Sequence, residues 1–97
     1  MTRFALIDID SGFAWGVADA ESPAEACRLV DEDFGADGRD YEDHGPDSYA
    51  DRQGRPGYIV HEVPAGFDVD DGQDKAQIAA VEAHPRVAIV LITDNDR

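Results

Sequence analysis

The sequence predicts an α+β fold, with two helices packed on one face of a four-stranded mixed sheet as a two-layer domain in the order ββαβαβ. The first observation is the uninterrupted apolar run at residues 87–92, typical of a strand covered on both faces. The second is a helix-start signal at Ser22 and Pro23. The third is the length of 97 residues, which corresponds to a single domain, 1–97, able to bury a core without disulfides or metal.

Two strands joined by a tight turn are predicted at the start of the chain. Residues 4–10 form the first strand, and Gly12 lies in a turn that favours a positive φ. Residues 13–18 return as the second strand, with Trp15 on a face of large side chains and Gly16 on a face of small ones. The small face leaves room for another element to lie close.

The first helix is predicted between Ser22 and Gly35. Ser22 can cap the helix, Pro23 suits its first position, and Glu25 completes a capping box. Gly35 is suited to the left-handed conformation that ends a helix. The apolar residues that recur at helical spacing are Ala26, Leu29, Val30 and Phe34.

A long acidic loop is predicted at residues 36–57, where large apolar residues are few. The alternative is a short strand near residues 39–42, and Tyr41 and Tyr49 are expected to pin the segment to the core. Residues 58–63 then form a third strand.

The last third of the chain is predicted to hold a helix and a final strand. The helix spans residues 72–83, is capped by Asp70 or Asp71, and ends before Pro85. Residues 87–92 follow as the fourth strand. If the third and fourth strands are parallel, this helix is a right-handed crossover between them.

Charge decides which partners are compatible with the chain. The formal net charge is −14, with only eight Lys and Arg residues, so direct binding to nucleic acid or to an anionic membrane is not expected. No apolar run reaches the ~20 residues of a membrane span. Cys27 is the single cysteine, and the chain enters strand-like sequence without a signal-peptide pattern. We therefore expect a cytoplasmic protein whose partner is a basic protein surface.

The end of the first strand carries the strongest enzyme-like pattern. Asp8 and Asp10 resemble the strand-end D-x-D of haloacid-dehalogenase-type phosphatases, and the resemblance implies a nucleophilic Asp8 and an acid/base Asp10 beside Mg²⁺. Gly12 stands where that family has Thr, and 97 residues cannot hold the family's doubly wound domain. A small metal- or phosphate-handling enzyme is therefore the competing hypothesis, and we expect a non-enzyme.

No metal or other cofactor is predicted. His44, His61 and His84 are far apart and have no cysteine partners at ligand spacing. Residues 68–72 suggest a calcium loop, but Ala79 stands where an EF-hand needs its final Glu. Cys27 lies near the apolar stripe of the first helix and is interpreted as a core residue.

Acidic residues are densest around the end of the first helix and the loop after it. Some lie in the last turn of the helix, where the helix dipole disfavours anions, and such local rule-breaking often marks a functional site. The predicted partner-binding residues are Asp31, Glu32, Asp33, Asp37, Asp40, Glu42, Asp43, Asp47 and Asp51.

These acids predict an interaction protein that occupies a basic site on its partner. Spaced carboxylates can take the place of phosphates, as in phage-encoded inhibitors of bacterial defence, an analogy of charge and size. One alternative is a merely solvated acidic face. Another is a housekeeping domain with an apolar partner contact through Trp15 or the tyrosines.

Overall fold

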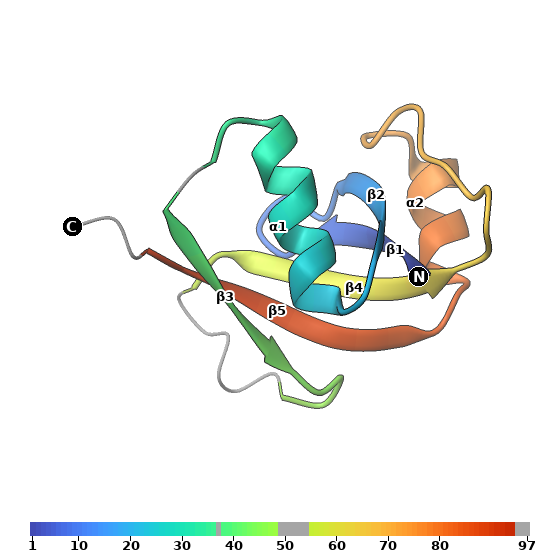
Figure 1. Ribbon diagram of the computed structural model, residues 1–97. Coiled ribbons are helices and arrows are strands. Elements are labelled where there is room, and N and C mark those ends of the chain that lie inside the picture. Colours follow the sequence, from blue (N-terminus) through green and yellow to red (C-terminus); the bar gives the residue numbers. More distant parts are fainter. Residues whose placement is uncertain (37, 49–54, 95–97) are drawn as a thin grey trace.

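Five strands and two helices make up the described part of the chain, which in this computed structural model covers residues 1–36, 38–48 and 55–94. The elements are β1 (Thr2–Asp8), β2 (Ala14–Ala20), α1 (Pro23–Asp33), β3 (Arg39–His44), β4 (Gly57–Val63), α2 (Lys75–Glu82) and β5 (Arg86–Asp94) (Figure 1).

The five strands form one sheet in the order β2-β1-β4-β5-β3, and every neighbouring pair is antiparallel. The α+β class and the β1–β2 hairpin are confirmed. The predicted four-stranded mixed sheet is wrong, because β3 adds a fifth strand and no parallel pair exists among the described strands. β4 and β5 are antiparallel neighbours, so α2 connects them without the predicted parallel crossover.

The apolar run in β5 lies inside the sheet, between β4 and β3. Five of the six residues at 87–92 are buried, and Val87 is partly buried. The prediction of an interior strand is therefore confirmed. Ile89, Val90 and Leu91 are completely buried, which accounts for the absence of polar residues from this run.

The two helices pack on opposite faces of the sheet, so their predicted placement on one face is wrong. Leu6 of β1 joins the core cluster that contains Val30 of α1. Its neighbour Ile7 joins the cluster that contains Val81 of α2. Successive side chains of a strand point to opposite faces, and both faces of β1 are apolar, so each face needs its own cover. Figure 1 shows α1 lying across the strands, well separated from α2.

The ends of α1 follow from its own sequence. The Ser22 side chain accepts a hydrogen bond from the Glu25 amide at 3.1 Å, and Pro23 occupies the first turn. The Glu25 carboxylate binds Arg28, so it does not complete the predicted capping box. Gly35 ends the helix at φ +75°, and the Ala36 amide donates to the Asp31 carbonyl across the cap.

The start of α2 differs from the prediction. The helix is capped by Asp74, whose side chain accepts from the Ala76 amide at 3.1 Å. The amides of Asp70 and Asp71 instead donate to the Gln77 side chain at 2.7 and 3.0 Å, which holds the preceding residues in a loop. The predicted helix at residues 72–83 is therefore shortened to Lys75–Glu82.

Candidate functional site

The acidic segment contains an edge strand where a long loop was predicted. Arg39–His44 forms β3, which pairs with β5 on one side and is the last strand of the sheet. The alternative of a short strand near residues 39–42 is thus confirmed and extended by two residues. Most side chains of β3 are exposed, and Tyr41, opposite Ile92, is partly buried.

The predicted partner-binding acids divide into three groups. Asp37 and Asp51 form the first group and lie outside the described residues, as does Tyr49. Asp31 forms the second group and is buried, with 2% of its surface exposed. The predicted acids that the structure places on the surface are Glu32, Asp33, Asp40, Glu42, Asp43 and Asp47. We call these six residues the acidic surface.

Asp31 is the internal anchor that joins α1 to the sheet. Its carboxylate accepts a hydrogen bond from the Tyr58 hydroxyl of β4 at 2.5 Å and another from the Tyr41 hydroxyl of β3. The Arg39 guanidinium lies 3.6 Å away. A buried carboxylate held in this way does not face a partner, so Asp31 is corrected from a binding residue to a structural one. The prediction that Tyr41 pins its segment is confirmed.

The hydroxyls of Tyr41 and Tyr58, which donate to Asp31, stay protonated. Burial, followed by the hydrogen bond to Asp31, raises the pKa of both Tyr41 and Tyr58 above the ordinary tyrosine value. Both groups therefore keep the protons that they donate to the carboxylate. This network also explains why an anion lies in the last turn of α1: two hydroxyl donors and Arg39 offset the unfavourable helix dipole.

The same anchor brings two elements that carry acids together. Because Asp31 binds Tyr41, the end of α1 with Glu32 and Asp33 lies beside β3, which carries the other acids. Alternate residues of a strand are about 6.8 Å apart, so Asp40 and Glu42 present two charges along one line, on the face of β3 opposite to that of Tyr41. Partial burial raises the pKa of Asp43, so this acid takes up a proton at a higher pH than an ordinary aspartate does.

Three members of the acidic surface already lie beside arginines, and the longest of these pairs joins Asp47 and Arg86 at 4.0 Å. Glu32 lies 2.6 Å from Arg28, and Glu42 lies 2.7 Å from Arg55. Exposed ion pairs of this kind contribute about 0–1 kcal/mol, since water screens both charges. The arginine of a partner can therefore replace Arg28 or Arg55 at small cost.

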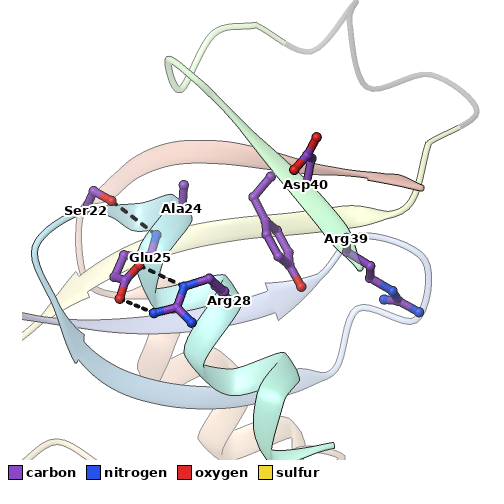
Figure 2. A pocket seen from close by; sticks show the side chains of 7 residues that line it. Ser22, Ala24, Glu25, Arg28, Arg39 and Asp40 are labelled. Carbon is purple, nitrogen blue, oxygen red and sulfur yellow. Dashed lines mark hydrogen bonds and ion pairs between the residues drawn. The ribbon is translucent and has the colours of Figure 1, made fainter. Parts of the chain in front are cut away.

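A shallow pocket of about 260 Å³ lies between α1 and β3. Figure 2 shows Arg28 directed toward Glu25 on its own helix, with Arg39 and Asp40 across the pocket on β3. The charged groups of its lining are of both signs, and Arg28 is occupied by Glu25 and Glu32. The pocket thus offers no concentration of charge for an ionic ligand.

The enzyme-like Asp pair lies at the β1–β2 turn. The Asp8 carboxylate accepts from the Ser11 amide at 3.0 Å and from the Ser11 hydroxyl at 2.7 Å, which is ordinary turn chemistry, and Asp10 is exposed. Within residues 1–36, 38–48 and 55–94, no three His, Cys, Asp or Glu side chains are grouped to hold a metal ion.

We predict that neither aspartate supports phosphate chemistry. With Mg²⁺ and a generic aryl phosphate, the wild type should release no more product than the double variant Asp8→Asn, Asp10→Asn. The unfolding free energy of the double variant should differ from that of the wild type by less than about 1 kcal/mol, because the amide oxygen introduced by Asp8→Asn still accepts from Ser11. Turnover by the wild type that the double variant loses would support the enzyme hypothesis.

The cysteine and two of the histidines considered in the sequence analysis make contacts within the fold. Cys27 of α1 is completely buried in the core, as predicted, and burial raises the pKa of its thiol. The His61 ring nitrogen Nδ1 lies 2.9 Å from the His84 carbonyl, and the His84 ring packs edge-on against Phe67. These contacts connect β4 to the end of α2.

One surface feature was missed. Phe34 was assigned to the apolar stripe of the first helix, but 65% of its surface is exposed and its ring contacts Trp15. The sequence did contain a signal for this exposure, because Phe34 comes directly before the helix-ending Gly35. A residue at the cap no longer follows the helical spacing, so it need not lie on the apolar face.

Comparison with protein-family models, curated proteins and solved structures finds no match for this chain. Neither helix in the described part of the chain is long and apolar enough to cross a membrane.

Proposed function

We propose that this protein is a non-enzymatic interaction protein whose acidic surface occupies a basic site on a partner protein. The observation that carries the proposal is the density of exposed carboxylates on two adjoining segments, the last turn of α1 and the edge strand β3, which the buried Asp31 anchor joins. A basic groove that binds nucleic acid fits such a surface, because carboxylates spaced along a strand can take the place of phosphates. Inhibition of nucleic-acid-binding machinery is the corresponding role.

The charge of β3 also restricts the kind of partner. An exposed edge strand is a template for pairing with other chains, and like charges on it oppose pairing with a second copy. Asp40, Glu42 and Asp43 give β3 this protection. A basic partner is the exception, since it neutralises the charge that repels other chains.

Neutralising exposed acids of the acidic surface should weaken binding. The triple variant Asp33→Asn, Asp40→Asn, Asp43→Asn removes three charges and leaves the Asp31 anchor in place. Once capture and mass spectrometry have identified the partner, its association rate should fall about tenfold at low salt, with a smaller change in dissociation. The difference should shrink between about 0.01 M and about 0.15 M salt, as the Debye length falls from roughly 30 Å to roughly 8 Å.

The matched control separates a local surface from net charge. Glu21→Gln, Glu62→Gln, Glu82→Gln also removes three exposed charges, but these residues lie outside the acidic surface. The control should keep most of the wild-type association rate. Equal rates and equal salt slopes for the wild type and the triple Asp→Asn variant would contradict the proposal.

A further inference from the structure

Exposed aromatic residues gather where β2 meets the end of α1. The large apolar residues that are most exposed in the described part of the chain are Met1, Phe13, Trp15 and Phe34. Trp15 and Phe34 are 39% and 65% exposed, and their ring centroids lie 5.4 Å apart at an interplanar angle of 42°. Phe13 is close to Trp15 in sequence, so three of the four belong to one region.

Backbone features, and not burial, hold this pair in place. In the β1–β2 register, Leu6 faces Gly16 and Ile7 faces Ala14, so Trp15 is the extra residue of a bulge. Bulges redirect side chains and are common beside functional sites. Phe34 is the C-cap of α1, and its amide donates to the last turn while Gly35 reverses the chain. The bulge and the helix cap therefore fix the backbone of Trp15 and Phe34, whose rings are partly exposed to solvent.

Two segments that carry acidic residues adjoin the pair. Glu32 and Asp33 precede Phe34, and the C-terminal end of α1 adds the negative end of the helix dipole. On the other side, the Ala14 amide donates to the Gly72 carbonyl at 2.9 Å, which brings the loop that contains Asp71 against the start of β2. In Figure 1 the end of α1 and the loop before α2 both lie at the top of the view.

An aromatic face with acidic residues nearby is suited to a cation that has an apolar face. The arginine guanidinium is planar, always charged and weakly hydrated, so it stacks on indole and phenyl rings better than the lysine ammonium does. Such contacts contribute measurably to binding even at exposed sites, and arginine and tryptophan are both enriched among the residues that dominate binding energy.

We infer that the Trp15–Phe34 pair is the anchoring site for an arginine of a basic partner protein. This inference rests on the proposed function and deepens it: the acidic surface attracts the partner, and the aromatic pair selects arginine over lysine.

Trp15 itself provides the measurement, because it is the single tryptophan of the chain. The probes are a short oligo-arginine peptide and an oligo-lysine peptide of the same length. At low salt, oligo-arginine should change the Trp15 fluorescence saturably and bind about fivefold more tightly than oligo-lysine. In the variant Phe34→Ala, which leaves Trp15 as the single ring, this preference should fall to about twofold, whereas binding of oligo-lysine should hardly change.

A second variant separates ring chemistry from apolar area. Phe34→Leu keeps an apolar side chain at this exposed cap but removes the aromatic ring, so it should lower the arginine preference as Phe34→Ala does. Retention of the full preference in Phe34→Leu would contradict an arginine site made by both rings. The melting temperatures of both variants should stay within a few degrees of the wild-type value, since the position is mostly exposed.

The outcomes distinguish this inference from the proposed function. Equal binding of both peptides, unchanged by Phe34→Ala, overturns the aromatic site and supports the acidic surface. Arginine preference that survives with full affinity in Asp40→Asn, Asp43→Asn supports the aromatic site and contradicts the acidic surface. Absence of binding by either peptide overturns both.

Discussion

Replacing Val90 by Asp should leave the chain unfolded under native conditions. Val90 is completely buried in β5, between Tyr58 of β4 and Asp43 of β3 in the strand register. An unpaired carboxylate at this position costs several kcal/mol, whether it stays charged or takes up a proton. The total stability of a domain of this size is about 5–15 kcal/mol, so one such change removes most of it.

The control for Val90→Asp is Val90→Thr, which has nearly the same shape and adds one buried hydroxyl. Its cost is about 1–3 kcal/mol, so the chain should remain folded with a lower melting temperature. Circular dichroism and thermal unfolding report both results. A cooperative transition for Val90→Asp near the wild-type temperature would show that β5 is not the interior strand on which the sheet depends.

Replacing Asp31 by Ala should be the most destabilising change among the nine predicted binding acids. The substitution leaves the hydroxyls of Tyr58 and Tyr41 without their acceptor and leaves Arg39 without its nearby carboxylate. Hydrogen bonds to a charged group contribute about 1.5–3 kcal/mol each, so we expect a loss of about 3 kcal/mol. Asp31→Asn should lose about half as much, since one carbonyl oxygen remains to accept.

The control is Asp33→Ala, two residues further along the same helix. Asp33 is exposed, and its replacement should change stability by less than about 0.5 kcal/mol. Urea unfolding of the variants measures the difference directly. Equal losses of unfolding free energy for Asp31→Ala and Asp33→Ala would contradict the structural role of Asp31 and would support its prediction as a binding residue.

The same network makes stability depend on alkaline pH. Burial and the hydrogen bond to Asp31 raise the pKa of Tyr58 above its ordinary value of about 10. A group whose pKa is higher in the folded state stabilises the fold below its unfolded pKa, and that contribution is lost as the pH rises toward the folded value. Stability should therefore fall above about pH 10, and Tyr58→Phe should flatten that decline in urea unfolding measured across the alkaline range.

Local patterns were sufficient for α1 and β5. Ser22 and Gly35 delimit α1 because a cap and a left-handed turn are properties of a few neighbouring residues. The run at 87–92 predicted an interior strand because six apolar side chains in succession require cover on both faces. The same reasoning applied to β1, where Ile7 is apolar on the face opposite Leu6, would have placed the helices on different faces.

Local patterns were insufficient for β3 and for the start of α2. β3 has one large apolar residue, Tyr41, and it is a strand because β5 offers an unpaired edge and Asp31 accepts the Tyr41 hydroxyl. For α2, several aspartates in succession could serve as the cap, and the Gln77 side chain selects Asp74 by binding the amides before it.

The α+β class, the acidity and the location of most exposed acids could be predicted from the sequence, because these depend on composition and on short-range patterns. That Asp31 is buried while Asp33 is exposed depends on the packing of distant segments. The Asp31 carboxylate is buried because donors 10 and 27 residues away, Tyr41 and Tyr58, meet it across the sheet. The aromatic pair was likewise decided by a bulge that sets Trp15 beside Phe34. Burial and pairing between distant segments have no signature in the local spacing of residues.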